Sequence, residues 1–233
     1  MKKKLIYLLI PILFVSCVST GGIEDFYISN FTENELPEEC YLKENEEPKV
    51  YYSSNLEDDI NFLKSNYYQI LGYSSYNGPG NSDIEKNVIN LCKQKKAQVG
   101  LFNYNYTDTR YGVYTLSTGY VNSYNIQRYD YTVILFSRLP SWYISNQKTG
   151  FEIIDLDTYS RQTLQRNTGV VVDVVYNGSK AFYANLIRND VIIEINGNPI
   201  YSSNDYYSYI NLYSGNTFSL KIIRNGKELV INY

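Results

Sequence analysis

The stretch GVVVDVVYNGSKAFYANLIRNDVIIEINGNPI, residues 169–200, decides the fold of the C-terminal half. Residues 170–175 and 191–195 consist of Val and Ile apart from Asp173 and Glu194, and have the length of strands. The residues between them are typical of turns and a short helix. Further along, residues 224–227 read Arg-Asn-Gly-Lys, and Asn-Gly is the preferred two-residue turn of a β-hairpin. The sequence therefore predicts a small domain of strands and short helices here.

Composition excludes several functions. The chain has 233 residues, with 21 Lys+Arg, 24 Asp+Glu and no His. A net charge of -3 gives no basic footprint, so we expect no nucleic-acid partner. Without His the chain cannot build a Ser-His-Asp or Cys-His catalytic set or a His-containing zinc site. Asp-Thr-Gly and Asp-Ser-Gly triplets and nucleotide-binding loops are absent too. We expect no enzyme activity, no metal and no cofactor.

Residues 1–17, MKKKLIYLLIPILFVSC, read as an export signal. Three lysines precede an apolar run that is too short to span a bilayer, which needs about 20 residues. The ending Val15-Ser16-Cys17 resembles the lipobox of bacterial lipoproteins, although Phe14 replaces the usual Leu. The resemblance implies that Cys17 carries acyl chains (palmitate). The protein would then be lipid-anchored to the bacterial cell envelope, at the inner or outer membrane and on the periplasmic or outer surface.

Residues 18–48 are predicted to be an acidic tether, since they carry a cluster of glutamates and few apolar runs. Residues 49–140 are predicted to form a small α/β domain of unknown function. In it, Asn55 caps a helix with Leu56, Ile60 and Leu63 on one face.

The rest of that domain is predicted as follows. Ser82 and Glu85 form a capping box for a second helix. A strand at residues 67–73 is broken by Asn-Gly-Pro-Gly at residues 77–80. Two more strands, residues 97–106 and 131–137, flank a Tyr-rich stretch, residues 107–129, that is a hairpin or a mobile loop.

Residues 141–233 resemble a PDZ domain of the type found in envelope high-temperature-requirement proteases. The resemblance is carried by the stretch quoted first, by residues 204–213, 217–224 and 227–232 after it, and by the Asn-Gly hairpin. Lys180 replaces the usual Pro, and Asn185 and Asn189 replace usual glycines. Asn tolerates left-handed backbone better than most residues, so these turns should persist. The fold class is therefore α+β: an N-terminal α/β domain, then a PDZ domain, which is a partly open β-barrel or sandwich with two helices.

The resemblance implies a peptide-binding groove, in which an extended peptide adds to a sheet edge and loop N–H groups hold its carboxylate. The positions matching the loop and first strand are Lys148, Thr149, Gly150, Phe151, Glu152 and Ile153. Thr149 stands where an apolar residue is usual. An alternative interpretation is that Gly150 only turns the chain into the strand and takes no part in binding a carboxylate. On the helix, Tyr206, Ile210 and Tyr213 are expected to face the core, while Tyr207 and Asn211 line the groove.

Three functional hypotheses follow. The chain is a non-catalytic adaptor that binds polypeptide C-termini or strands of envelope proteins. Alternatively, it is a surface adhesin or structural lipoprotein that makes contacts through the Tyr-rich segment, residues 104–129. A third possibility is an accessory subunit of a separate protease.

Two smaller questions stay open. Cys40 and Cys92 could form a disulfide, but Cys92 lies on a core helix stripe and we favour free thiols. Asp155, Asp157 and Asp173 could suggest calcium, but no calcium-loop motif is present and helix-cap or strand-end roles are favoured.

Overall fold

The computed structural model describes residues 22–32, 35–146, 148–213 and 217–233. The export signal and Cys17 lie outside these residues. The described chain divides into two compact units. Unit 1 contains residues up to 36, then Tyr41–Ser54 and Ile70–Phe136; unit 2 contains Pro37–Cys40, Asn55–Gln69 and Ser137–Tyr233.

Unit 1 is built on a five-stranded sheet with the order β1-β3-β5-β4-β2. Strands β1 and β3 are antiparallel, as are β4 and β5, while β2 runs parallel to β4. The elements are 3₁₀ helix η1 (Ile23–Phe26), β1 (Tyr27–Ser29), β2 (Lys49–Tyr52), β3 (Tyr68–Pro79), α2 (Ile84–Lys95), β4 (Val99–Thr115) and β5 (Val121–Arg138).

Helix α2 covers one face of this sheet. Its buried residues Ile84, Val88, Leu91 and Cys92 lie on one helical stripe and pack against side chains of β3, β4 and β5. Gly100 on β4 allows the close approach, since a Cβ there would lie 2.8 Å from Cys92 Sγ and 2.9 Å from Val88 Cγ1.

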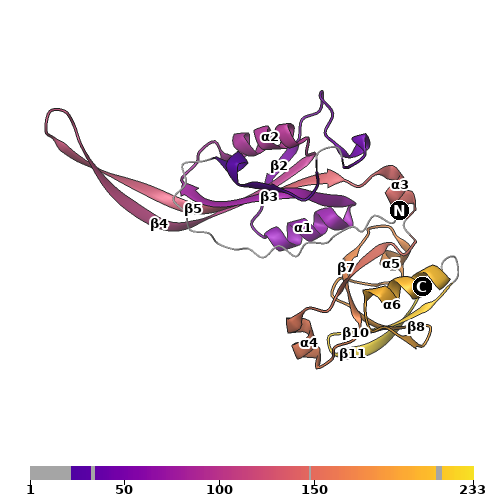
Figure 1. Ribbon diagram of the computed structural model, residues 1–233. Helices are drawn as coiled ribbons and strands as arrows, with labels where there is room; N and C mark the ends of the chain where they lie inside the picture. The colour runs from indigo at the N-terminus through magenta and orange to yellow at the C-terminus, as the bar shows by residue number, and fades with distance from the viewer. Residues whose placement is uncertain (1–21, 33–34, 147, 214–216) are drawn as a thin grey trace. The chain divides into compact units, whose positions relative to one another are not determined.

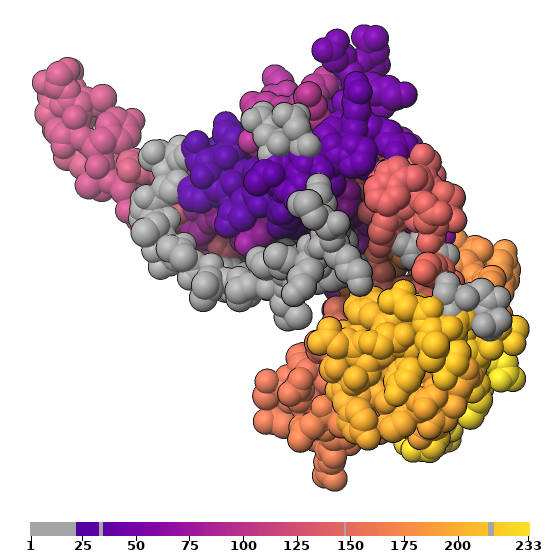
Figure 2. Space-filling view, turned by 45° about the vertical axis from the view of Figure 1, so that its right-hand side comes forward, coloured from indigo at the N-terminus to yellow at the C-terminus, as the bar shows by residue number. Residues whose placement is uncertain are grey.

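The β4–β5 hairpin continues as a two-stranded ribbon beyond the rest of unit 1 (Figures 1 and 2). We call residues 107–128 the arm. The register runs without a break from Asp108↔Arg128 to Thr115↔Val121. Exposed apolar side chains occupy both strands and the tip: Tyr111, Val113, Tyr114, Leu116, Tyr120, Val121 and Tyr124. Of the two interpretations of the Tyr-rich stretch, the hairpin is therefore the one observed.

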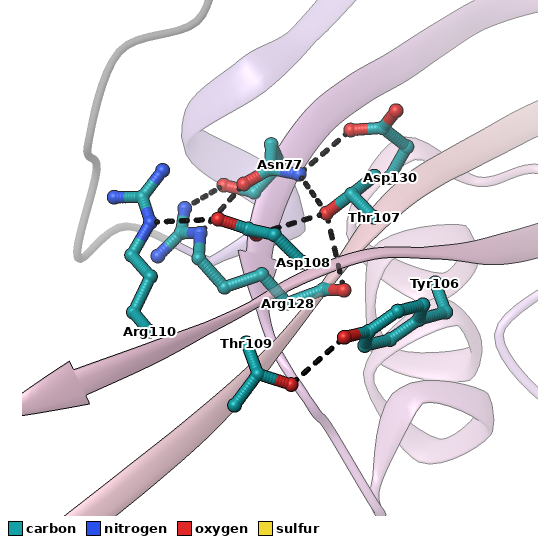
Figure 3. Close-up of polar contacts among 8 residues, drawn as sticks. All are labelled: Asn77, Tyr106, Thr107, Asp108, Thr109, Arg110, Arg128 and Asp130. Carbon is teal, nitrogen blue, oxygen red and sulfur yellow. Dashed lines mark hydrogen bonds and ion pairs between the residues drawn. The ribbon is translucent and has the colours of Figure 1, made fainter.

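A polar network holds the root of the arm (Figure 3). Arg128 is only 5% exposed, and its Nε and Nη2 donate to Oδ1 and the backbone O of Asn77, at 2.6 and 2.7 Å. The Asn77 amide donates in turn to Asp130 Oδ1 (2.8 Å) and Thr107 Oγ1 (3.0 Å). The sheet register shifts between Tyr106 and Asp108, at Thr107. The network therefore fixes a β-bulge at the point where the arm leaves the sheet.

Unit 2 contains an open sheet with the order β11-β10-β8-β7-β6, and β9 pairs with β8. Among the described residues this sheet does not close into a barrel. The elements are 3₁₀ helix η2 (Glu38–Cys40), α1 (Leu56–Ser65), α3 (Ser141–Ser145), β6 (Phe151–Asp155), α4 (Thr158–Leu164), β7 (Val170–Val175), α5 (Lys180–Tyr183), β8 (Val191–Ile195), β9 (Asn198–Pro199), α6 (Ser203–Tyr213), β10 (Ser219–Arg224) and β11 (Lys227–Asn232).

The core of unit 2 lies between this sheet and helices α5 and α6. It includes Phe151, Val172, Ile192, Ile210 and Leu220, all buried. The predicted turns at Asn185 and Asn189 are confirmed. Asn185 and Asn189 have φ of 63° and 71°, so both adopt the left-handed backbone that the family's glycines would supply.

Helix α1 belongs to unit 2, although residues 66–169 separate it in sequence from β7, the strand that it contacts. Three contacts join these distant segments: an ion pair, a pair of stacked rings and a backbone hydrogen bond. Lys64 Nζ lies 2.5 Å from Asp173 Oδ2 on β7, and both side chains are largely buried. The Tyr67 ring stacks on that of Tyr176 with centroids 4.5 Å apart. Asn177 N donates to Ser65 O at 2.9 Å.

Three predictions about organisation need correction. Residues 18–48 are not simply a solvated tether: Ile23 packs into the core of unit 1 and β1 pairs with β3. The division at residue 140 also fails for residues 55–69, which contact β7 in unit 2 rather than completing an N-terminal domain. Finally, β3 runs through Gly78 to Pro79 instead of ending before residue 77, since Asn77 is held by Arg128.

The cysteines are free, as favoured, but both are buried. Cys92 lies on the core face of α2, as predicted. Cys40 is not a thiol in a solvated tether, because it is fully buried at the end of η2. In addition, none of the helices in the described part of the chain is long and apolar enough to cross a membrane.

Candidate peptide-binding site

Strand β6 forms one edge of the sheet in unit 2. Within the described residues it pairs with β7 alone, and helix α6 lies beside it. The predicted residues from the loop, the strand and the helix therefore come together at this edge. We call the arrangement of residues 148–150, β6 and α6 the β6–α6 site.

The loop before β6 is held in a conformation that requires glycine. Gly150 has φ of 65°, and a Cβ on it would lie 2.3 Å from Ser179 Cβ. Its carbonyl oxygen accepts from Tyr176 N at 2.9 Å and from Ser179 Oγ at 3.0 Å. Gly150 thus does more than turn the chain into the strand, because it fixes the loop against the start of α5.

Thr149 and Phe151 anchor the two sides of Gly150. The Thr149 side chain is buried although it is polar, and its hydroxyl donates to Phe151 O at 3.2 Å. Phe151 packs edge-on against Tyr206 and Tyr233. Thr149 therefore takes the buried place of the usual apolar residue by satisfying its hydroxyl within the loop.

Strand β6 presents backbone groups to its free edge. In an antiparallel pair, opposed residues direct their N–H and C=O groups either toward each other or away. Val172 lies opposite Ile153, yet its N–H donates to Asp190 O (2.8 Å) and its C=O accepts from Asn189 N (2.9 Å). The backbone groups of Ile153 consequently point away from β7, toward the edge where a peptide strand would pair.

Helix α6 supplies the other side of the site. Tyr206 and Ile210 are buried in the core and Tyr213 packs against it, as the helical spacing predicted. Tyr207 remains 47% exposed, and Asn211 is exposed as well. Burial, and then the charges of Glu152 and Asp155, raise the pKa of Tyr207. Helix α6 contacts β6, so the partly exposed Tyr207 stays a candidate for lining the site, whereas no contact places Asn211 there.

Glu152 is fixed by two tyrosines. Its Oε1 accepts from the hydroxyl of Tyr143 at 3.1 Å and from that of Tyr176 in a short hydrogen bond. The carboxylate is therefore held at the edge of β6 rather than moving freely in solvent. Lys148, in contrast, is exposed at the start of the loop.

The sequence alone did not indicate that Asp155 joins β6 to α6 in this site. Its carboxylate accepts from Ser203 N at 2.8 Å and from Ser203 Oγ at 3.1 Å, joining the end of β6 to the first residue of α6. The helix-cap interpretation of Asp155 and Asp157 is confirmed, since Asp157 accepts from Ser160 N at the start of α4. Asp173 is instead paired with Lys64. The contact between Asp155 and Ser203 could not be predicted from local sequence patterns, because 48 positions separate the two residues in the chain.

Residues that could hold a metal are not gathered anywhere in the described part of the chain, where no group of three Cys, Asp or Glu side chains has suitable geometry. The chemistry available at the β6–α6 site is thus hydrogen bonding, apolar packing and charge.

Residues 148–233 match the PDZ domain family. The fold and the edge strand described above are therefore those of a PDZ domain, a class of domain that binds extended peptides at a sheet edge. The predicted fold class is confirmed.

Two solved structures are similar to this chain. One is titled "HtrA-type protease AlgW with decapeptide", with 21% sequence identity and a TM-score of 0.33; it matches over 42% of this chain and 35% of that chain. The other is "HtrA-type protease AlgW with tripeptide", with 20% identity, a TM-score of 0.31, and 42% and 38% covered. The chain thus spans little more than a third of these proteins. No curated protein sequence matches the chain.

Proposed function

We propose that this protein is a lipid-anchored adaptor of the bacterial envelope that binds polypeptide C-termini or extended strands through its PDZ domain. The observation that supports binding most directly is the free edge of β6, where the backbone of Ile153 faces outward beside the Gly150 loop. A peptide strand added there would pair with these groups while loop N–H groups hold its carboxylate.

The anchor and the envelope location rest on residues 1–17, where basic residues, an apolar run and Cys17 follow in the order of a lipoprotein signal. Acyl chains contribute about 0.8 kcal/mol per buried CH₂, so a multiply acylated Cys17 holds a chain on a membrane firmly. The non-catalytic role rests on the lack of His in the chain and on the absence of a catalytic motif in its sequence.

The test uses residues 18–233, which include every residue that the structure describes. A library of peptides with free C-termini is screened by fluorescence anisotropy, and each binder is remade as its C-terminal amide. We expect saturable binding that weakens strongly on amidation for C-terminal ligands. Binding that ignores the carboxylate would assign internal strands as the ligands, and no binding by any peptide would contradict the proposal.

A matched pair of variants locates the binding. Gly150→Trp should abolish it, because the side chain would collide with Ser179. Gly178→Trp is the control: Gly178 also has positive φ (72°), but open space surrounds its Cβ position. If the control loses binding as Gly150→Trp does, the loop is not the ligand site.

A second function, contact with a partner through the arm, is favoured by one observation. The arm exposes aromatic side chains along both strands, and residues 111–127 contain no charged residue. Large exposed apolar patches typically mark interaction sites. Shortening the arm by joining residue 108 to 128 would separate the two functions, since it should leave peptide binding intact and remove arm-dependent contacts.

A further inference from the structure

The charges along the β6–α6 site are not evenly distributed. Strand β6 carries Glu152 and Asp155, and helix α6 adds Asp205. Neither element contains Lys or Arg. A peptide lying along β6 would therefore meet only acidic charges from the two elements that flank it.

The carboxylates of Glu152 and Asp155 are held in place. Two tyrosine hydroxyls bind Glu152, and Ser203 binds Asp155 through its N–H and hydroxyl. Ser203 is the first residue of α6, so the Asp155 carboxylate lies beside this helix. Glu152 lies opposite Val174 of β7 and shares with it the other face of the sheet, where Tyr143 and Tyr176 pack. A fixed carboxylate loses little side-chain freedom on binding a cation, so the ion pair gains more than a pair between two mobile chains.

The loop end of the site has the opposite character. Lys148 starts the loop, and Lys180 directly follows Ser179, whose hydroxyl bonds Gly150. Both lysines are exposed, and neither forms an ion pair with another described residue. Their charge favours an anionic group near the loop, as the C-terminal carboxylate of a peptide would be.

We propose that the β6–α6 site selects peptides with a free C-terminal carboxylate and a Lys or Arg about four residues before the end. The inference rests on the proposed function and specifies the ligand. With the carboxylate at the loop, the peptide runs antiparallel to β6. If its last residue lies opposite Phe151, the residue four positions earlier lies opposite Asp155, about 13 Å away at 3.3–3.4 Å per residue.

The test compares three peptides that differ at this one position, with Lys, Ala or Glu in an otherwise neutral sequence that ends in an apolar residue. Fluorescence anisotropy with residues 18–233 gives the three dissociation constants. An exposed charge pair is worth roughly 0.2–1 kcal/mol, so we expect the Lys peptide to bind about 1.5- to 5-fold more tightly than the Ala peptide. The Glu peptide should bind more weakly than either. At about 1 M salt the differences should largely disappear, since the screening length falls to about 3 Å.

Variants that remove one negative charge test whether Asp155 causes the preference for the Lys peptide. Asp155→Asn keeps one oxygen acceptor for Ser203 N, its amide can donate to the Ser203 hydroxyl, and it should reduce the ratio between the Lys and Ala dissociation constants toward one. Glu228→Gln removes one negative charge from β11, the opposite edge of the same sheet, and should leave the ratio unchanged. The salt titration of the unmodified protein gives an independent readout if Asp155→Asn unfolds.

The possible results are distinct. Equal binding of Lys and Ala peptides overturns the charge selection but leaves the proposed function standing. A Lys preference that survives in Asp155→Asn, or that does not fall with salt, also overturns it. If neither peptide binds at any salt concentration, the inference fails, while the proposed function is decided by the screen of the whole library.

Discussion

Single residues decide whether the carboxylate loop can form. Gly150 and Gly178 have nearly the same φ, 65° and 72°, but their surroundings differ. A Cβ on Gly150 would overlap Ser179, whereas a Cβ on Gly178 would meet no atom within 4 Å. The two positions therefore separate the cost of left-handed backbone from the cost of a collision.

We predict that Gly150→Ala destabilises unit 2 more than Gly178→Ala does. The latter should cost about 1 kcal/mol, as expected for Ala in left-handed backbone. Gly150→Ala should cost about 1–3 kcal/mol more, since Ser179 must also move. Urea unfolding measures the loss of unfolding free energy in both variants. Equal losses would contradict the prediction, because they would mean that moving Ser179 costs no free energy.

The buried thiol of Cys92 makes stability depend on pH. Burial raises the pKa of Cys92 from 9.0 to about 12. The folded state thus favours the neutral thiol, and its contribution is complete below pH 9 and is lost as the pH rises toward 12.

We predict that Cys92→Ala weakens the alkaline loss of stability. Above pH 9 the unmodified protein should lose up to about 1.4 kcal/mol per pH unit from this thiol alone. Urea unfolding at several pH values between 8 and 11 gives the slope of the unfolding free energy against pH for both proteins. Tyrosines contribute equally to the two slopes, so the difference between them belongs to the thiol. Parallel slopes would mean that the thiol ionises without cost in the folded state.

At the scale of elements, two contacts join segments that are distant in sequence. Asn77 on β3 and Arg128 on β5 meet at the root of the arm, while α1 is fastened to β7 by Lys64 and Asp173. Both contacts contain a mostly buried charge, and removing one partner of such a contact leaves the other poorly solvated.

For the arm, we predict that Asn77→Ala destabilises unit 1 by about 2–3 kcal/mol, because the buried Arg128 guanidinium loses its side-chain acceptor. Arg110→Ala is the control. It breaks an ion pair with Asp108 that is about half exposed, and should cost less than about 1 kcal/mol. Thermal unfolding measures both, and equal effects would show that the network at the root adds nothing beyond a surface pair.

For α1, we predict that Lys64→Met costs about 1–3 kcal/mol, since Asp173 is left largely buried and unpaired. Glu57→Gln on the same helix breaks the more exposed pair with Arg188, and should cost about 0–1 kcal/mol. Hydrogen exchange of α1 and β7 amides, measured for both variants, should show faster exchange in both elements only for Lys64→Met.

How far the sequence predicts these elements depends on how local the cause is. The cap of α1 by Asn55 and the stripe of α2 are local patterns, and both are present. The left-handed asparagines of unit 2 follow from residue chemistry in the same way. The assignment of α1 to unit 2 could not be predicted, since no local pattern indicates that Lys64 pairs with Asp173.

The candidate site shows the same limit. Residues 148–153 were predicted because the resemblance to a known family aligned them, and Tyr207 because helical spacing places it beside the core-facing stripe of its helix. Asp155 was predicted to have a helix-cap or strand-end role, but its partner could not be named, since Ser203 lies 48 positions away in the chain. Likewise, the arm was known as a Tyr-rich stretch, but only the strand register distinguishes a hairpin from a loop.

At the scale of the whole molecule, the N-terminal anchor gives a prediction about location. In cells that export the full chain, Cys17→Ser should stop the incorporation of labelled palmitate and move the protein from the membrane fraction to the soluble fraction. Thr20→Ser, outside the Val15-Ser16-Cys17 motif, is a control that keeps the cysteine. If the wild-type protein incorporates no labelled palmitate and is found in the soluble fraction, the lipidation of Cys17 is contradicted.

The discontinuous make-up of unit 2 has a consequence for how the chain folds as the ribosome releases it. Unit 1 is complete once residue 136 has emerged, but α1 lacks its partner until Asp173 follows, 109 residues after Lys64. At 5–20 residues per second this interval lasts roughly 5–20 s. During it, Lys64 and the ring of Tyr67 stay without their native contacts. The PDZ unit is thus completed after unit 1, and helix α1 is made well before the strand on which it packs.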